Sequence, residues 1–286
     1  MSNIWRTTIR SDGMKPFLKW AGNKYRIVNK IRGILPPGKR LIEPFAGSAA
    51  VFLNTEYKEN FINDRNTDLI NVFVTLKQFG PAFIDACKSL FTPEHNVPRV
   101  YYEFREEFNA TRDLFRKAAL FIYLNRHGYN GLCRYNNDGG FNVPFGRYKK
   151  PYFPFDEMMM FYHKSQSATF LTEDFETVMQ QAQPGDVIYC DPPYVPLSAT
   201  ANFTNYSAGG FGFGEQLRLA KAAREASGRG VPVLISNHQT PFTEEIYQTA
   251  QITTFDVQRL ISCDSTNRNK ATELLALFPA LVSSVN

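Results

Sequence analysis

The tetrapeptide Asp191-Pro192-Pro193-Tyr194 has the residue types needed to make an aromatic amine attack a methyl group. It follows Asp186-Val187-Ile188-Tyr189-Cys190, an apolar run typical of a buried strand. A carboxylate is therefore expected where a strand ends, in a turn stiffened by two prolines. The exocyclic amine of adenine or cytosine needs such help, because its lone pair is delocalised into the ring.

The proposed chemistry uses hydrogen-bond acceptors. Asp191 supplies one acceptor for the amine hydrogens and the carbonyl of Pro192 a second, since proline keeps its C=O. Fixed dipoles aimed at developing positive charge stabilise the transition state. Tyr194 would stack on the base, which is worth ~1–3 kcal/mol. The alternative is that the tetrapeptide is only a strand-ending turn.

Length and composition predict a globular protein with a large core. The chain has 286 residues, 43% of them hydrophobic, which suits one large domain or a domain with an insertion. No apolar run approaches the ~20 residues of a membrane span, and residues 1–13 lack an apolar signal core. We therefore expect a cytoplasmic protein without membrane or metal partners and with reduced thiols. Its four cysteines show no metal-ligand spacing: Cys87, Cys133, Cys190 and Cys263.

Positive charge is concentrated in residues 99–150. The whole chain carries a net charge of +5, and this segment alone holds ten Lys/Arg against five Asp/Glu. It also carries twelve Phe/Tyr residues. Basic charge interleaved with aromatic rings is typical of nucleic-acid binding. A solvated helix face over an aromatic core would give the same composition.

A cofactor-binding half of an α/β fold is predicted near the N-terminus. Residues 40–43 form an expected strand, residues 44–50 a turn into a helix, and residues 61–64 a second strand ending in Asp64. Asp64 lies 17 residues after Gly47, close to the ~20 expected for an acid that binds ribose hydroxyls. A single glycine favours a nucleoside without phosphates. Alternatively, Asp64 is a helix N-cap.

An inserted arm is predicted between two parts of the α/β core. Residues 125–136 are not periodic, and Asn137-Asp138-Gly139-Gly140 is a hairpin-turn signal. Pro144 makes the expected return strand, residues 141–146, an edge strand. We expect helices at 68–79, 83–90, 101–109 and 114–124 to carry this β-hairpin arm. Later strands are predicted at 168–171, 187–190, 231–237, 255–257 and 273–277, and a helix at 214–229.

These elements together predict a Rossmann-like mixed sheet with an inserted helical and β-hairpin recognition domain. The expected boundaries are a tail at 1–13, a catalytic domain from 14–67 and 160–286, and a recognition domain at 68–159. Residues 198–214, rich in Gly, Ser, Thr and Asn, form an expected lid over the bound base.

Four stretches of the chain resemble the Dam family of S-adenosylmethionine-dependent DNA adenine-N6 methyltransferases, which act at GATC sites. The resemblance covers about residues 17–277. The stretches are Phe17-Leu18-Lys19-Trp20-Ala21-Gly22-Asn23-Lys24-Tyr25, Glu43-Pro44-Phe45-Ala46-Gly47, Asn125-Arg126-His127-Gly128-Tyr129-Asn130-Gly131-Leu132-Cys133-Arg134-Tyr135-Asn136, and the Asp191 tetrapeptide.

The resemblance implies a role for each matching residue. The implied catalytic residues are Asp191, Pro192, Pro193 and Tyr194. The implied S-adenosylmethionine-binding residues are Trp20, Ala21, Lys24, Glu43, Phe45, Asp64, Asp174, Phe175 and Asp191. The implied DNA-binding residues are Lys19, Arg105, Tyr129, Asn130, Leu132, Arg134, Asn136 and Pro144. Asn23 and Ala49 stand where the family usually has glycine, which adds bulk near the cofactor.

Within the DNA-binding set, Lys19 and Arg134 match readers of guanine, whose O6 and N7 suit these side chains. Tyr129 matches an aromatic wedge and Asn130 a contact to the unpaired thymine. Arg105 and Asn136 match phosphate contacts, and Leu132 and Pro144 apolar neighbours of base pairs. The expected partner is double-stranded DNA bound by a monomer, with adenine flipped out of the stack.

Other classes of function share parts of this pattern. A cytosine-N4 DNA methyltransferase needs the same amine chemistry, and RNA or protein-glutamine methyltransferases carry similar tetrapeptides. A DNA-binding regulator without methyltransferase activity is the non-enzymatic alternative. Binding of S-adenosylmethionine and analysis of the methylated base would separate these classes.

Overall fold

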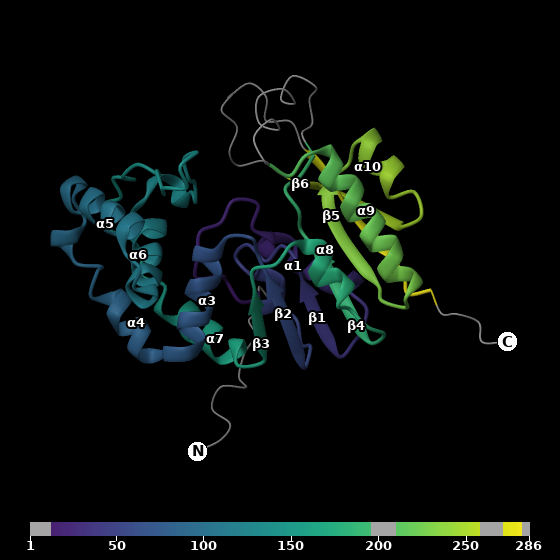
Figure 1. Ribbon diagram of the computed structural model, residues 1–286, viewed down its shortest axis with the longest axis horizontal. Coiled ribbons are helices and arrows are strands. Elements are labelled where there is room, and N and C mark those ends of the chain that lie inside the picture. Colours follow the sequence, from purple (N-terminus) through teal and green to yellow (C-terminus); the bar gives the residue numbers. More distant parts are fainter. Residues whose placement is uncertain (1–12, 196–209, 258–270, 282–286) are drawn as a thin grey trace, which may run out of the picture. The chain divides into compact units, whose positions relative to one another are not determined.

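The computed structural model describes residues 13–195, 210–257 and 271–281 (Figure 1). The chain divides into two compact units. The first unit contains Met1–Arg32, Ala46–Glu56 and Asp64–Thr172, and the second contains Gly33–Phe45, Tyr57–Asn63 and Glu173–Asn286. The predicted recognition segment, residues 68–159, falls inside the first unit. The predicted tail before Gly13 and residues 198–209 of the predicted lid lie outside the described residues.

The protein has the mixed seven-stranded sheet that the sequence predicts, and six of its strands belong to the second unit. Four of these six run parallel in the order β2-β1-β4-β5; β7 follows antiparallel to β5, and β6 follows antiparallel to β7. Their bounds are β1 (Arg40–Glu43), β2 (Glu59–Asn63), β4 (Asp186–Cys190), β5 (Val233–His238), β6 (Gln251–Val257) and β7 (Ala271–Phe278).

The parallel register brings the ends of neighbouring strands to one edge. Ile42 of β1 is level with Ile188 of β4, and Ile188 is level with Val233 of β5. All five residues of β4 are buried, as expected of a central parallel strand covered on both faces. The segments that follow β1 and β4, which begin at Pro44 and Asp191, therefore leave the same edge of the sheet. Such edges hold the ligands of open α/β folds.

Three helices of the second unit cover its strands: α8 (Phe175–Gln180), α9 (Phe213–Gly228) and α10 (Pro241–Ile246). Figure 1 shows α8 beside α9, and α9 running along β5. The buried side of α9 includes Ala220, Ala223 and Ala226, whose small side chains let the helix lie close to the sheet. A capping box between Thr240 and Thr243 starts α10.

The first unit is mainly helical. Its elements are η1 (Lys24–Ile27), α1 (Val28–Ile34, whose last two residues belong to the second unit), α2 (Ala50–Leu53), α3 (Thr67–Phe79), α4 (Pro81–Lys88), η2 (Pro93–His95), α5 (Pro98–Ala110), α6 (Leu114–His127), η3 (Tyr129–Gly131), α7 (Phe155–Ser165) and β3 (Ala168–Leu171).

Helix α6 lies at the centre of this unit and packs on α3, α4 and α5. Its residues from Ala118 to His127 are all buried. An aromatic cluster adds to the core, with Phe161 at 5.0 Å from Phe17 and 4.8 Å from Phe73 between ring centroids. The helices predicted at 68–79, 83–90, 101–109 and 114–124 correspond to α3, α4, α5 and α6, each with slightly different ends.

The predicted β-hairpin arm is not a regular hairpin. The turn is present, since Gly139 N–H donates to Asn136 O at 3.0 Å, but only isolated bridges join the two segments, Tyr135 to Phe141 and Gly128 to Phe145. One reason is that α5 takes the polar backbone groups of the return segment. Asn109 accepts from Phe141 N–H at 2.8 Å and donates to Phe141 O at 3.1 Å.

No helix among the described residues is both long enough and apolar enough to cross a membrane.

His127 is a buried titratable group at the end of α6. Its ring stacks on Tyr123 with centroids 3.9 Å apart and lies 4.8 Å from the ring of Phe91. Its Nδ1 is 2.9 Å from Tyr123 O. Burial is the main cause that lowers the pKa of His127 from 6.5 to about 4.

This shift predicts acid sensitivity. Below pH 6.5 the unfolded chain binds a proton at His127 that the folded chain does not, so the free energy of unfolding falls until the pH reaches about 4. At pH 5 the loss is about 2 kcal/mol relative to pH 7. His127→Gln should remove this part of the pH dependence, as measured by urea unfolding at the two pH values. An equal pH dependence in wild type and variant would contradict the assignment.

Candidate active site

The Asp191 tetrapeptide lies directly after β4, as predicted. Asp191 and Tyr194 are partly buried, Pro192 is buried and Pro193 is exposed. The carboxylate is therefore placed at the carboxyl edge of the parallel strands, in a segment whose backbone the two prolines restrict.

Two buried amide side chains hold this turn. Gln216 of α9 donates from Nε2 to Pro193 O at 2.7 Å, and Asn237 of β5 accepts from Val195 N–H at 3.1 Å. The two amides also bond to each other, Asn237 Nδ2 to Gln216 Oε1, at 3.0 Å. The turn is thus fixed from both sides by groups that are fully withdrawn from water. Neither residue belongs to a motif that predicts this role, although a glutamine and an asparagine at core positions are a usable signal.

The hydroxyl of Tyr194 stays protonated in this site. Burial, followed by the negative charge of Asp191, raises the pKa of Tyr194 well above its usual value. Its hydroxyl donates to Glu273 at 3.3 Å, and its ring meets the edge of His238 with centroids 4.8 Å apart. His238 is itself held by a 2.7 Å contact from Nδ1 to Val195 O. The aromatic group expected to stack on a base is therefore held in place.

Asp64 of the first unit accepts two backbone hydrogen bonds. Gly47 N–H donates to Oδ2 and Asn66 N–H to Oδ1, each at 2.9 Å. Burial raises the pKa of Asp64, and these two hydrogen bonds oppose the shift. The N-cap of α3 is Asn66, which accepts from Leu69 N–H, so the alternative that Asp64 caps this helix is wrong.

The indole ring of Trp20 packs closely against Gly47. A Cβ atom on Gly47 would lie 2.8 Å from Trp20 Nε1, and Gly47 has a φ of +49°. Only glycine meets both conditions without displacement. Trp20 and Asp64, both expected to bind the cofactor, therefore each lie against Gly47. Lys24 is buried, and its Nζ donates to Gly22 O at 2.7 Å.

The two positions where the related family usually has glycine differ in backbone conformation. Ala49 adopts a left-handed conformation with a φ of 57°, which costs an L-residue roughly 1–2 kcal/mol and explains a preference for glycine. Asn23 has a φ of −51°, and its side chain accepts from Tyr25 N–H at 2.8 Å to cap η1. Asn23 therefore has a structural role of its own.

An aromatic cluster of the second unit contains two of the predicted cofactor residues. The ring of Phe45 lies 5.3 Å from that of Phe175, and Phe211 is within 5.3 and 5.7 Å of the two. Asp174 is the N-cap of α8 and accepts from Glu176 N–H at 3.0 Å. Of the remaining predicted cofactor residues, Glu43 is buried at the end of β1 and Ala21 is exposed.

The predicted DNA-binding residues all lie in the first unit. Lys19 is fixed at its backbone by the side chain of Asn125, which accepts from Lys19 N–H at 2.9 Å and donates to Lys19 O at 2.8 Å. Burial, and then the charge of Arg126, lower the pKa of Lys19. The Lys19 Nζ lies 4.1 Å from the centre of the Tyr148 ring.

Near the hairpin turn, Arg134 is exposed and donates from Nε to Asn142 Oδ1 at 2.8 Å. Tyr129 is 52% exposed, and its neighbour Asn130 adopts a φ of 54°. A large exposed ring therefore stands on a tight turn at this position. The other predicted members of this set are Arg105, which donates to Val143 O, Asn136, which accepts from Gly140 N–H, partly buried Leu132 and exposed Pro144.

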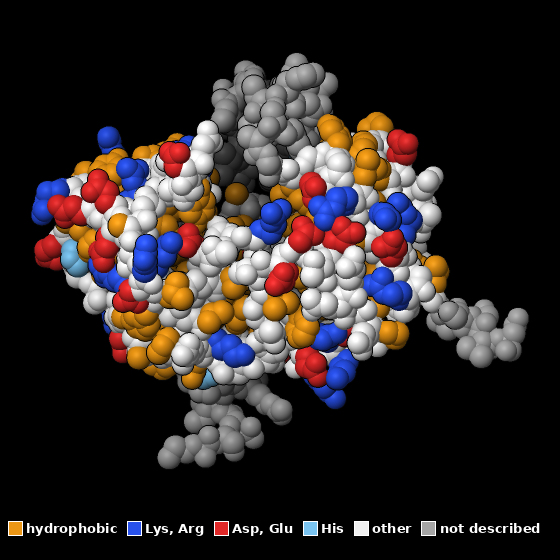
Figure 2. Space-filling view, in the orientation of Figure 1, with side chains coloured by type: hydrophobic (Ala, Val, Ile, Leu, Met, Phe, Trp, Pro, Cys, Tyr) orange, Lys and Arg blue, Asp and Glu red, His pale blue; other side chains and the backbone are white. Residues whose placement is uncertain are grey.

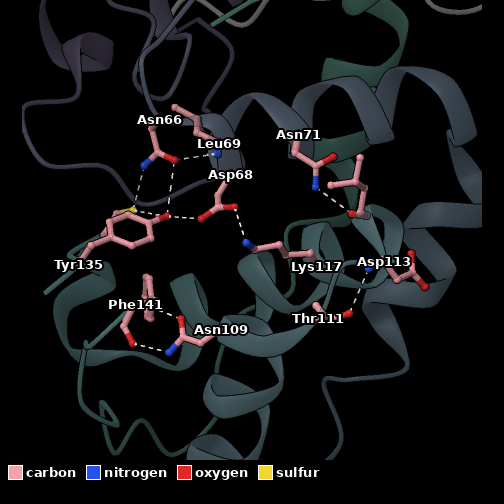
Figure 3. A network of polar contacts seen from close by, with 12 residues as sticks. Asn66, Asp68, Leu69, Asn71, Asn109, Thr111, Asp113, Lys117, Tyr135 and Phe141 are labelled. Carbon is pink, nitrogen blue, oxygen red and sulfur yellow. Dashed lines mark hydrogen bonds and ion pairs between the residues drawn. The ribbon is translucent and has the colours of Figure 1, made fainter. Parts of the chain in front are cut away.

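A polar network joins this segment to the loop that follows Asp64 (Figure 3). Tyr135 donates to Asp68 Oδ2 at 2.9 Å, and Asp68 Oδ1 forms an ion pair with Lys117 at 3.1 Å. Asn66 donates to Cys133 Sγ at 3.5 Å. Residues on both sides of Arg134 are therefore tied to the first turn of α3. Local sequence patterns do not predict these contacts, because the paired residues lie at least 49 positions apart in the sequence.

Part of the charge and aromatic content of residues 99–150 has a structural role. Five of the twelve aromatic residues are buried in the core of the first unit: Tyr101, Phe108, Phe121, Tyr123 and Phe141. Some cations pair with acids, as in Arg116 with Glu107 at 2.6 Å. Figure 2 shows acidic and basic side chains intermixed on the visible face over α5. The alternative of a solvated helix face over an aromatic core is thus confirmed for part of the segment. Across the described residues, no group of three His, Cys, Asp or Glu could hold a metal ion.

The family model for D12 class N6 adenine-specific DNA methyltransferases matches residues 20–261. The chain belongs to this family. The match confirms the family resemblance and the class of enzyme that the sequence predicts, an adenine-specific DNA methyltransferase.

Curated relatives agree with the family match. A protein of Escherichia coli (strain K12) named DNA adenine methylase is 50% identical over 94% of this chain and 97% of its own length. Proteins of the same name from Salmonella typhi and Vibrio cholerae are 49% and 48% identical over 92% and 94% of this chain, and over 95% and 98% of their own lengths.

The contact between Trp20 and Gly47 gives a testable expectation. Gly47→Ala should lower the free energy of unfolding by at least about 1–2 kcal/mol, because alanine is strained at positive φ and its Cβ would displace Trp20. The measurement is chemical denaturation. Gly33→Ala in α1 is the control. It meets no atom within 4 Å, so alanine should stabilise that helix by about 0.5–1 kcal/mol. Equal effects of the two substitutions would refute the close approach.

Proposed function

We propose that this protein transfers a methyl group from S-adenosylmethionine to N6 of adenine in double-stranded DNA, at GATC sites. One observation carries the proposal: in a chain of this family, Asp191 follows the central parallel strand β4, in a turn held by Gln216 and Asn237. The reaction would take place in the cytosol, with the protein acting as a monomer.

Residues of each unit, taken separately, suit part of a nucleoside cofactor without phosphates. Asp64 supplies a carboxylate for ribose hydroxyls beside a loop with a single close glycine, Gly47. Phe45 and Phe175 supply apolar ring faces for a purine, and Asp174 a hydrogen-bond acceptor. We assign cofactor binding to these residues together with Trp20, Ala21, Lys24, Glu43 and Asp191. S-adenosylmethionine supplies a methyl group activated by a sulfonium, so the protein need not generate an electrophile.

Asp191 and the Pro192 carbonyl act on the adenine amine. Both accept hydrogen bonds from N6, which draws the nitrogen towards a tetrahedral geometry and makes its lone pair available. Because the turn is held by Gln216 and Asn237, these acceptors need not reorganise during the reaction. Tyr194 stacks on the base, and the proton leaves to Asp191 or to water. Pro193 keeps the turn stiff.

Recognition of DNA is assigned to the first unit. The adenine amine cannot be reached inside a duplex, so the base must be flipped out, and Tyr129 fills the space beside the opened pair while Asn130 meets the unpaired thymine. Lys19 and Arg134 each read a guanine through O6 and N7. The remaining contacts are assigned to Leu132 and Pro144 for base pairs and to Arg105 and Asn136 for phosphates.

A methyl-transfer assay with and without a GATC site tests the proposal. We expect transfer from labelled S-adenosylmethionine to the GATC duplex, with N6-methyladenine as the product. Asp191→Ala should lower kcat by at least about 100-fold, since it removes an acceptor that acts in the transition state. Asp85→Ala, which changes an exposed carboxylate on α4, should leave kcat unchanged. Undiminished turnover in Asp191→Ala, or N4-methylcytosine as product, would overturn the proposal.

A second test addresses base reading by Arg134. Arg134→Ala should reduce discrimination against a substitution at one guanine by ~1–3 kcal/mol, with smaller changes at the other positions. The quantity measured is kcat/KM for a set of duplexes with single substitutions. Arg105→Ala is the comparison, because loss of a phosphate contact weakens all duplexes alike. A uniform loss in Arg134→Ala would show that Arg134 binds phosphate instead.

A further inference from the structure

Arg218 of α9 connects to the first turn of α8 through several hydrogen bonds. Its Nη2 lies 2.9 Å from Asp174 Oδ1 and 2.8 Å from Glu176 Oε2, and its Nε donates to the same glutamate oxygen at 3.0 Å. Its Nη1 donates to Glu215 Oε2, one turn earlier on α9, at 2.7 Å. One guanidinium therefore holds three carboxylates from two helices. In Figure 2, acidic and basic side chains adjoin one another over α8 and α9.

The same guanidinium also packs on an aromatic ring. Its Cζ lies 4.8 Å from the centre of the Phe175 ring, and Phe175 is only 2% exposed. Phe175 in turn contacts Phe45. Arg218 thus contacts three consecutive residues, Asp174, Phe175 and Glu176, and two of them are assigned to the nucleoside.

The contacts at Asp174 fix its orientation. A single oxygen, Oδ1, accepts both from Glu176 N–H at 3.0 Å and from Arg218 Nη2. These two donors set the rotation of the carboxylate, and with it the direction of Oδ2. Without Arg218, three carboxylates would remain close together, and their repulsion would separate the start of α8 from α9.

We propose that Arg218 is a positioning residue for the adenine end of the cofactor, which holds Asp174 and Phe175 in the arrangement that binds the nucleoside. This inference rests on the proposed function, since it takes those two residues as cofactor contacts. Arg218 itself need not contact the cofactor. Arginine suits the position because its planar guanidinium donates to several carboxylates while stacking on a ring, which a lysine cannot do.

A purely structural role is the competing explanation, because Arg218 joins α8 to α9 through ion pairs. The Arg218 side chain is 41% exposed, however, and exposed ion pairs add little stability. The chain offers a matched control at the opposite end of the same helix. Arg229, which follows α9, donates from Nη2 to Met179 O of α8 at 2.9 Å. Both arginines connect α8 to α9, but only Arg218 contacts the assigned cofactor residues.

The test is isothermal titration calorimetry of the full chain with S-adenosylhomocysteine, the demethylated product of the cofactor. We expect Arg218→Ala to raise Kd about tenfold, or about 1.4 kcal/mol. Arg218→Lys should raise Kd about two- to fivefold, because lysine keeps the charge without the fork of donors. Arg229→Ala should stay within about twofold of the wild type. In steady-state assays, Arg218→Ala should raise KM for S-adenosylmethionine, with kcat at saturation within about twofold.

The outcomes distinguish failure of the proposed function from failure of the role of Arg218. If the wild type does not bind S-adenosylhomocysteine, the proposed function fails. If the wild type binds but Arg218→Ala and Arg229→Ala have the same Kd within about twofold, only the role of Arg218 is refuted. A loss confined to kcat would also refute it. Should Arg218→Ala not fold, as judged by its thermal transition, the comparison of Arg218→Lys with Arg229→Ala decides by the same criteria.

Discussion

The parallel register of β1, β4 and β5 is the constraint on which the candidate site depends. It brings the ends of these strands to one edge of the sheet, so that the chain leaves β4 as the Asp191 turn close to the end of β1. Strand ends alone do not fix a carboxylate, however. The buried pair Gln216 and Asn237 completes the arrangement by bonding to Pro193 and Val195. An α/β core, with one helix and one strand beside the turn, therefore holds the backbone of the proposed catalytic turn through side chains of α9 and β5.

In the first unit, asparagine side chains make hydrogen bonds to backbone groups that a neighbouring strand would make in a sheet. The return segment after the turn at residues 137–140 bonds to Asn109 on α5, and Lys19 is bracketed by Asn125 on α6. The helices α5 and α6 therefore determine where these two segments lie, because the contacts come from side chains of the helices. The network around Tyr135 and Asp68 connects this surface to the loop of Asp64. The proposed recognition and cofactor residues of this unit are thus connected through one network of hydrogen bonds.

How much could be predicted from sequence depended on the range of the interactions. Apolar periodicity found β1, β4 and α6, and the spacing between Gly47 and Asp64 gave a pair that the structure joins by a hydrogen bond. The regular β-hairpin was a wrong expectation, because local turn signals say nothing about a helix such as α5 that competes for the same backbone groups. Gln216 and Arg218 were missed for a related reason. Their partners lie 23 and 44 residues away, and no periodicity reports such contacts.

The contact between Trp20 and Gly47 has an optical consequence. The chain contains two tryptophans, Trp5 and Trp20, and only Trp20 lies among the described residues. Its indole rests against the loop that also donates to Asp64. With Trp5 replaced by phenylalanine, Trp20 would be the sole indole fluorophore, and its emission would respond to changes in the polarity of this loop. The protein therefore carries an intrinsic spectroscopic reporter beside one of its best-defined acidic groups.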